Sequence, residues 1–213
     1  MHIFKNSTYF YYTNHVSIMK VKGVNTMNIP ICHSSSNTSN NVLKRTDFSS
    51  FLLASLLGVL FHFVYDWTGE NTLVGFFVPV NESTWEHLKL IFFPILLVSM
   101  AEYALTEYTL GGKLSECFSC IKFQSALLGM LTVVILFYTY SGILGTNFDW
   151  LNILTYFLGM AVAYGYSYKK RNTYMIACNS TLCIIGASVI VILFMIFSIY
   201  PPSLGLFQAP TVG

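Results

Sequence analysis

Apolar residues dominate the chain from residue 48 onward, in long runs that short polar stretches separate. A helix needs about 20 mainly apolar residues to cross the roughly 30 Å hydrocarbon core of a bilayer. The runs predict spans at about 48–67, from about 83 onward, and at about 123–145, 146–168 and 174–199. We therefore expect an all-α integral membrane bundle of about five transmembrane helices.

The first two predicted spans are joined by residues 68–83, which contain the apolar stretch LVGFFVPV. This stretch is too short to cross a bilayer. Irregular backbone at membrane depth must also be shielded from lipid, because its polar groups need partners. We interpret the stretch as a short interfacial or re-entrant segment.

The chain divides into three parts by composition. Residues 1–47 include the polar, low-complexity run CHSSSNTSNN, which cannot bury enough apolar area to offset the entropy cost of ordering it. The predicted organisation is a disordered cytosolic extension at 1–47, a transmembrane helical domain at 48–200 and a short tail at 201–213.

The overall composition also indicates a membrane protein. Hydrophobic residues make up 54% of the 213 residues and charged residues 9%, whereas about a quarter of a soluble domain is charged. The net charge of +2, without a basic patch interleaved with aromatic residues, argues against a nucleic-acid partner. The expected partner is the lipid bilayer, and the sequence gives no signal for an oligomeric state.

Lysine and arginine are concentrated before the first span and in the connections after the second and fourth spans. These residues are Lys44, Arg45, Lys113, Lys122, Lys169, Lys170 and Arg171. Short loops rich in lysine and arginine stay on the cytoplasmic side of a membrane. We therefore expect a multi-pass protein of the cell (inner) membrane with the N-terminus inside and the C-terminus outside.

The second span has too few uncharged residues to cross a bilayer alone. Only twelve residues lie between Lys89 and Glu102, whereas crossing takes about 20. The helix must therefore carry Lys89 together with Glu86, or Glu102, or all of them, into the membrane. At its start, Ser83 and Glu86 fit a capping box.

The ionisable residues around this connection can converge at the outer leaflet. On a helix, Glu82, Glu86 and Lys89 fall on one stripe, and His87 falls on the next. Near the end of the first span, His62 and Asp66 lie four residues apart. Helices joined by a short connection usually pack together, so the two groups of residues can meet. The candidate polar site comprises His62, Asp66, Asn81, Glu82, Glu86, His87, Lys89 and Glu102.

Three roles fit these residues. They can staple the first two helices, as in a scaffold or accessory subunit without chemistry. They can form a site for a small solute or ion, with Glu86 and His87 binding or exchanging protons, His62 and Asp66 opposite, and Lys89 as counter-charge. They can also hold zinc on His62, Asp66, His87 and a glutamate in a membrane-embedded hydrolase, with a nearby carboxylate as base. Handling of a small solute or ion is the leading functional interpretation.

Two features limit the zinc interpretation. No His-Glu-x-x-His motif is present, and the adjacent Glu86 and His87 point about 100° apart on a helix, so both cannot bind one ion without distortion.

Glu102 and the cysteines have simpler interpretations. Glu102 either marks the cytosolic end of the second span or forms a second station in a proton or cation path. Cys117 and Cys120 form a lone Cys-x-x-Cys pair, which is a weak metal signal because zinc takes four ligands. We expect these two thiols to be reduced and structurally idle, and Cys178 and Cys183 to be small core residues.

The segments HFVYDW and PVNESTWEHLKLIFFP carry a family resemblance. With them, the chain resembles a family of small bacterial multi-pass membrane proteins catalogued as a domain of unknown function, over about residues 50–200. The residues that match its motif are His62, Tyr65, Asp66, Asn81, Glu82, Trp85, Glu86, His87 and Lys89. The resemblance implies a membrane fold and supports the position of the site, and it implies no particular reaction.

Overall fold

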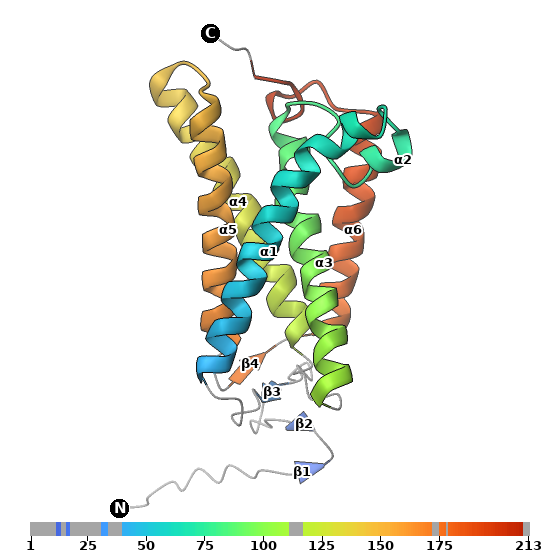
Figure 1. Cartoon of the computed structure of the whole chain (residues 1–213), viewed down its shortest axis with the longest axis vertical. Helices are drawn as coiled ribbons and strands as arrows, with labels where there is room; N and C mark the ends of the chain where they lie inside the picture. Colours follow the sequence, from blue (N-terminus) through green and yellow to red (C-terminus); the bar gives the residue numbers. More distant parts are fainter. Residues whose placement is uncertain are drawn as a thin grey trace, which may run out of the picture.

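Five long helices form the body of the protein (Figure 1). The computed structural model describes residues 12–13, 16–17, 31–33, 40–110, 117–171, 175–177 and 179–210. Its helices are α1 (Asn40–Trp67), α2 (Thr72–Gly75), α3 (Thr84–Leu110), α4 (Phe118–Leu144), α5 (Asp149–Arg171), α6 (Ser180–Ile199) and the 3₁₀ helix η1 (Gly205–Phe207). The apolar connection predicted between the first two spans contains the short helix α2.

Four short strands accompany the helical bundle and lie below it in Figure 1. They are β1 (Tyr12–Thr13), β2 (Val16–Ser17), β3 (Ile31–His33) and β4 (Met175–Ala177). The strands pair antiparallel in the order β1-β2-β3-β4. Most of the segment predicted to be disordered lies outside the described residues, and α1 begins at Asn40 rather than at Phe48.

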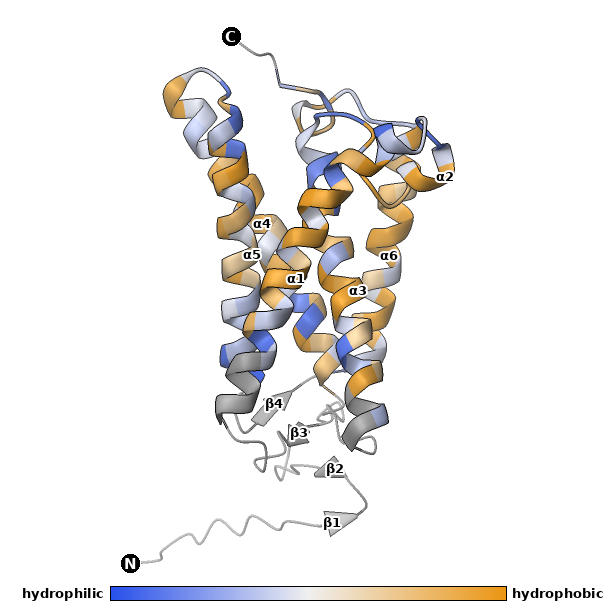
Figure 2. Ribbon diagram, viewed as in Figure 1, coloured by the Kyte–Doolittle hydropathy of each residue, from blue (hydrophilic) through white to orange (hydrophobic). Residues whose placement is uncertain are grey.

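The all-α membrane bundle predicted from the sequence is confirmed for the described part of the chain, with four apolar spans. The helices long and apolar enough to cross a membrane cover Thr46–Trp67, Thr84–Leu105, Phe118–Leu144 and Ser180–Ile199. The remaining long helix, α5, is about 35 Å long at 1.5 Å per residue. It is more polar than its neighbours, as its paler colour in Figure 2 shows, and its last turn contains three basic residues.

Glycines let helix α4 approach α5 closely and let helix α1 approach α3 closely. A Cβ atom on Gly129 of α4 would lie 3.0 Å from the carbonyl oxygen of Gly159 in α5. A Cβ atom on Gly58 of α1 would lie 2.6 Å from the carbonyl oxygen of Leu90 in α3. Small residues at helix contacts allow this approach in membrane bundles. The apolar core between the two pairs includes Ala54, Ile91, Phe92, Met160, Ala163 and Phe194.

Polar residues gather at both ends of this core. We call the end with α2, the start of α3 and the C-terminal segment the histidine end, which is uppermost in Figure 1. The opposite end, with the start of α4 and the last turn of α5, is called the basic end. Each end holds a cluster of ionisable side chains, described next.

Candidate functional site

Two separate polar clusters lie at the histidine end, on different faces of the first turns of α3. Glu86 and Lys89 are buried against α6, whereas His87 faces the end of α1. Adjacent helical residues point about 100° apart, which explains why Glu86 and His87 separate. The single polar site expected from the sequence is therefore two clusters.

The first cluster, which we call the histidine triad, consists of His62, Glu82 and His87. The Glu82 Oε2 and His87 Nε2 atoms are 3.3 Å apart, and the ring centroids of His62 and His87 are 5.3 Å apart. One ligand atom from each of the three residues lies within 4.8 Å of the others. Ligands held 2.0–2.2 Å from zinc at the tetrahedral angle lie about 3.4 Å apart, so a modest side-chain rotation would complete a metal site.

The backbone fixes the tautomer of His87. Its Nδ1 lies 2.9 Å from the carbonyl oxygen of Ser83. A carbonyl only accepts hydrogen bonds, so Nδ1 carries the proton and donates it. Metal-binding histidines usually donate their second ring N–H to a carbonyl or carboxylate in this way. His87 is therefore arranged to offer Nε2 to a ligand.

Glu82 lies in the loop just before α3, and its side chain is 66% exposed. The hydrogen bond that protonated His87 donates through Nε2 lowers the pKa of the Glu82 carboxyl below its usual value of 4.5, against a smaller opposing effect of burial. The positive charge of His87, when protonated, acts in the same direction. Glu82 is thus held as a carboxylate at neutral pH and can accept a cation.

The histidine triad opens into a cavity of about 730 Å³ between α1, α3, α4 and α5. Its polar lining includes Asn147, Asp149 and Asn152 near the connection of α4 to α5. Its apolar lining is more extensive and includes Val59, Phe63, Leu90, Val133, Phe137, Ile153 and Phe157. A mainly apolar cavity with a few convergent polar groups is the usual form of a ligand site.

The second cluster, which we call the lysine lock, is centred on Lys89. Its Nζ lies 2.6 Å from Glu86 Oε2, 2.6 Å from Ser198 Oγ and 2.7 Å from the carbonyl oxygen of Gly75. The carbonyl oxygen of Val78 lies at 3.2 Å. These contacts saturate the three donors of an ammonium group. Lys89 thereby joins α3 to α6 and to the connection that contains α2.

Glu86 is equally saturated within the lysine lock. Its Oε2 also accepts the backbone N–H of Val80 at 3.0 Å, and its Oε1 accepts the hydroxyl of Ser198 at 2.9 Å. Glu86 and Lys89 are 2% and 0% exposed. A buried ion pair of this kind tolerates little change once its hydrogen bonds are formed. The geometry of Glu86 and Lys89 is that of the helix staple considered above.

The predicted capping box at the start of α3 is half formed. Glu86 N donates to Ser83 Oγ at 3.3 Å, as expected. The Ser83 N–H is satisfied instead by Asn81 Oδ1 at 2.9 Å, since the Glu86 carboxylate is turned into the lysine lock. Asn81 is thus a turn residue that prepares the helix start. Asp66 is exposed near the end of α1 and is not part of the histidine triad.

Glu102 lies at the basic end in a buried ion-pair cluster with Asp47, Lys122 and Arg171. The Arg171 Nη1 atom is 2.5 Å from Glu102 Oε1 and 2.8 Å from Asp47 Oδ1. Lys122 Nζ is 3.0 Å from Glu102 Oε2. The acids come from α1 and α3, and the bases come from α4 and α5. The cluster therefore joins the two helix pairs at this end.

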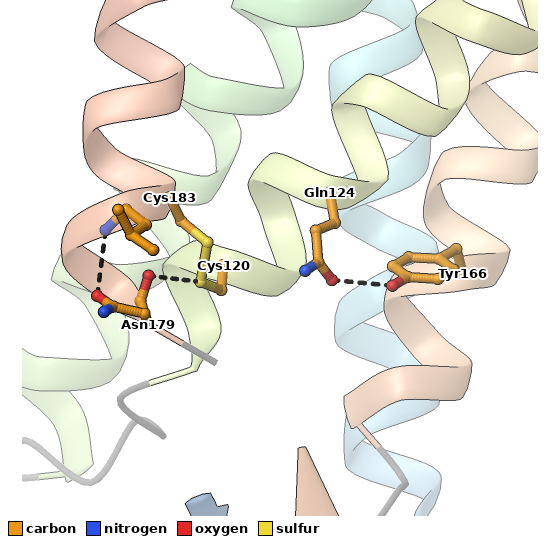
Figure 3. Close-up of a disulfide and its surroundings, with 6 residues drawn as sticks. Cys120, Gln124, Tyr166, Asn179 and Cys183 are labelled. Carbon is orange, nitrogen blue, oxygen red and sulfur yellow. Dashed lines mark hydrogen bonds between the residues drawn. A yellow bond between two sulfur atoms is a disulfide. The ribbon is translucent and has the colours of Figure 1, made fainter. Parts of the chain in front are cut away.

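The prediction that Cys117 and Cys120 are reduced, structurally idle thiols was wrong. Cys120 of α4 and Cys183 of α6 form a disulfide at the basic end, as Figure 3 shows. Cys117 is also disulfide-bonded, whereas Cys178 lies outside the described residues. The Cys120–Cys183 partners are 63 residues apart in sequence, and only the packing of α4 against α6 brings their Cα atoms to 5.2 Å.

The comparisons with known proteins give a family and no further relative. No curated protein and no solved structure matches this chain. The model of DUF6512, described as a family of unknown function, matches residues 37–213, which include the histidine triad, the lysine lock and the ion-pair cluster. This chain belongs to the DUF6512 family.

Proposed function

We propose that this protein binds a small divalent cation of the zinc type at the histidine triad and handles it at the membrane. One observation carries the proposal. His87 directs Nε2 at Glu82 Oε2 from 3.3 Å while its Nδ1–H is committed to Ser83. A neutral imidazole would then turn a lone pair toward a carboxylate, which is repulsive. A cation between the two atoms, either a proton or a metal ion, removes this repulsion.

The third member of the triad favours a metal ion over a proton alone. A single proton needs only the two atoms that share it, whereas His62 adds another imidazole within 4.8 Å. Two histidines and one glutamate are a ligand set for zinc that leaves a fourth position open. His62, Glu82 and His87 line the cavity, so an incoming or outgoing ligand would reach a bound metal ion from there.

We further propose that the histidine end faces outward from the cell (inner) membrane, with the N-terminus inside and the C-terminus outside. The basic residues lie toward the opposite end, and positive ends stay in the cytoplasm. The Cys120–Cys183 disulfide at the basic end is the competing observation, because disulfides persist mainly in oxidising compartments. A C-terminal alkaline phosphatase fusion should be active. An inactive fusion would place the C-terminus inside and contradict the proposed orientation.

Zinc uptake into proteoliposomes tests ion handling. Vesicles with an entrapped zinc-sensitive dye should respond faster with the purified protein than without it. The response should be lost in His87→Ala and His62→Ala. Asp66→Asn is the matched control, because Asp66 is an exposed residue near the same helix end, and it should retain the response. Equal responses from wild type and His87→Ala would overturn the proposal.

The second candidate function is metal-dependent hydrolysis. The specific observation in its favour is the carboxylate of Asp149, which lines the same cavity and is available as a general base. In this case the zinc-loaded protein would cleave an ester or phosphoester substrate, and Asp149→Asn would remove the activity while zinc binding persisted. Zinc uptake without turnover favours ion handling, and turnover without uptake favours hydrolysis.

A further inference from the structure

The cavity beside the histidine triad is much larger than a metal ion requires. Its volume is about 730 Å³, within the range of about 300–1,000 Å³ that holds whole organic ligands. One water molecule takes about 30 Å³ of liquid volume. A metal ion with its remaining waters would therefore leave most of the cavity to another occupant.

The walls of the cavity differ along its length. The histidine triad and the α4–α5 connection are polar, whereas Val59 and Phe63 of α1 and Ile153 and Phe157 of α5 are apolar. These four side chains are also 38–59% exposed, and those of α1 belong to a membrane-spanning stretch. The apolar part of the cavity therefore continues into the lipid-facing surface between α1 and α5.

The polar wall opposite the histidine triad favours an oxygen-rich group. The Oδ1 atoms of Asn147 and Asn152 both contact the hydroxyl of Tyr140. A hydroxyl has one hydrogen, so Tyr140 donates to one of these oxygens, and the amide that accepts this hydrogen keeps its nitrogen as a donor. Asp149 adds a negative charge on this side, but it is exposed and therefore screened by solvent. An amide donor and a metal ion together suit a phosphate or carboxylate.

From these features we propose that the cavity binds a single-chain amphiphile with an anionic head, either phosphate or carboxylate. The head takes the open coordination position of the cation on the histidine triad, and the chain lies along the apolar wall between α1 and α5. The inference rests on the proposed cation site, because the metal ion supplies the main attraction for the head. The bilayer is the source of the ligand, since the cavity adjoins its hydrocarbon.

Binding of labelled dodecyl phosphate to the full chain in lipid nanodiscs tests this inference, with empty nanodiscs measuring partition into lipid. Zinc should strengthen binding, and His87→Ala should remove the zinc effect. Dodecanoate tests the carboxylate head, whereas dodecanol and methyl phosphate lack the head or the chain and should not compete. Isothermal titration with zinc alone reports the cation site separately.

Two tryptophan variants test the position of the chain. Ile153→Trp places a larger side chain where the chain of the amphiphile would lie, and by excluding it should weaken binding about tenfold. Leu154→Trp is the matched control, because Leu154 is the next residue of α5, is similarly exposed and does not line the cavity. It should bind as wild type does.

The possible results separate the two proposals. Zinc binding together with dodecyl phosphate binding that is sensitive to Ile153→Trp supports both. If zinc binds but the protein binds no more dodecyl phosphate than empty nanodiscs do, the amphiphile proposal is overturned and the cation site remains. The same conclusion follows if methyl phosphate competes with labelled dodecyl phosphate as well as unlabelled dodecyl phosphate does. Equal binding by Ile153→Trp and wild type also overturns the amphiphile. An absence of zinc binding overturns both proposals.

Discussion

Lys89 Nζ lies 2.6 Å from Glu86 Oε2, and their side chains are 0% and 2% exposed. This buried ion pair holds the first turns of α3 against α6 through Ser198. The histidine triad lies on the neighbouring face of the same turns. The buried contacts of Glu86 and Lys89 thus indicate a structural role, and they are separate from His87, for which we propose a ligand-binding role.

Removing one member of the ion pair should be more harmful than removing both. Glu86→Gln leaves the ammonium of Lys89 buried without a counter-charge, which should lower the free energy of unfolding by about 3–5 kcal/mol. Glu86→Gln combined with Lys89→Met should recover a large part of this loss. Unfolding in mixed detergent and SDS micelles measures both variants. A wild-type stability for Glu86→Gln would contradict the lysine lock.

Ser198 should contribute to stability through its bonds to this charged pair. Ser198→Ala removes contacts of 2.6 Å to Lys89 and 2.9 Å to Glu86, and hydrogen bonds to charged groups contribute about 1.5–3 kcal/mol. The control is Ser188→Ala in the same helix, α6. Ser188 is exposed, and among the described contacts its hydroxyl donates only to the carbonyl oxygen of Ile184 in its own helix. Equal unfolding free energies for the two variants would argue against the link to α6.

The free energy of unfolding should depend on the charges of the ion-pair cluster at the basic end. Glu102→Gln removes one of the two described carboxylates, those of Glu102 and Asp47, that pair with Lys122 and Arg171, so we expect a loss of about 3–5 kcal/mol in the free energy of unfolding. The charge-swapped double variant Glu102→Arg, Arg171→Glu should be more stable than either single reversal. The same unfolding assay applies, and additive losses in the double variant would show that the two side chains do not interact.

Glu82 should titrate below the usual range of a glutamate. In the wild type, NMR of the labelled carboxyl should give a pKa below 4.5, because His87 donates a hydrogen bond to it. His87→Gln should move this pKa upward. A pKa that is lowered by folding stabilises the protein above the unfolded value and loses this effect as pH falls through the folded value.

The resulting effect on stability should be small. The Glu82 side chain is 66% exposed, and exposed pairs contribute at most about 1 kcal/mol. Glu82→Gln should therefore reduce the free energy of unfolding slightly at neutral pH and match the wild type under strongly acidic conditions. A difference in unfolding free energy between Glu82→Gln and the wild type that grows as pH falls would contradict a lowered pKa of Glu82.

The sequence predicted the helical membrane class because composition and run length depend on local residues alone. It also predicted that charged side chains accompany α3 into the bundle, and Lys89, Glu86 and Glu102 are all buried there. The partners of these residues could not be predicted in the same way. Ser198 is 109 residues from Lys89, and Arg171 is 69 residues from Glu102, so only the packing of the helices identifies them.

The prediction grouped Glu82 with Glu86 and Lys89, and the structure separates them for a local reason. Helical spacing places Glu82, Glu86 and Lys89 on one stripe, but α3 begins at Thr84, so Glu82 belongs to the preceding loop. Its side chain turns instead to His87 at 3.3 Å. The start of a helix, which sequence patterns locate only within a few residues, thus decides which carboxylate joins the histidines.

X-ray absorption spectroscopy of the zinc-loaded protein tests the central claim most directly. We predict one bound zinc per chain with two imidazole nitrogens and a carboxylate oxygen at about 2.0–2.2 Å. His62→Ala and His87→Ala should each remove one imidazole from the spectrum, whereas Asp66→Asn should leave it unchanged. A spectrum that keeps both imidazoles in the histidine variants, or that shows sulfur ligands, would contradict the histidine triad as the cation site.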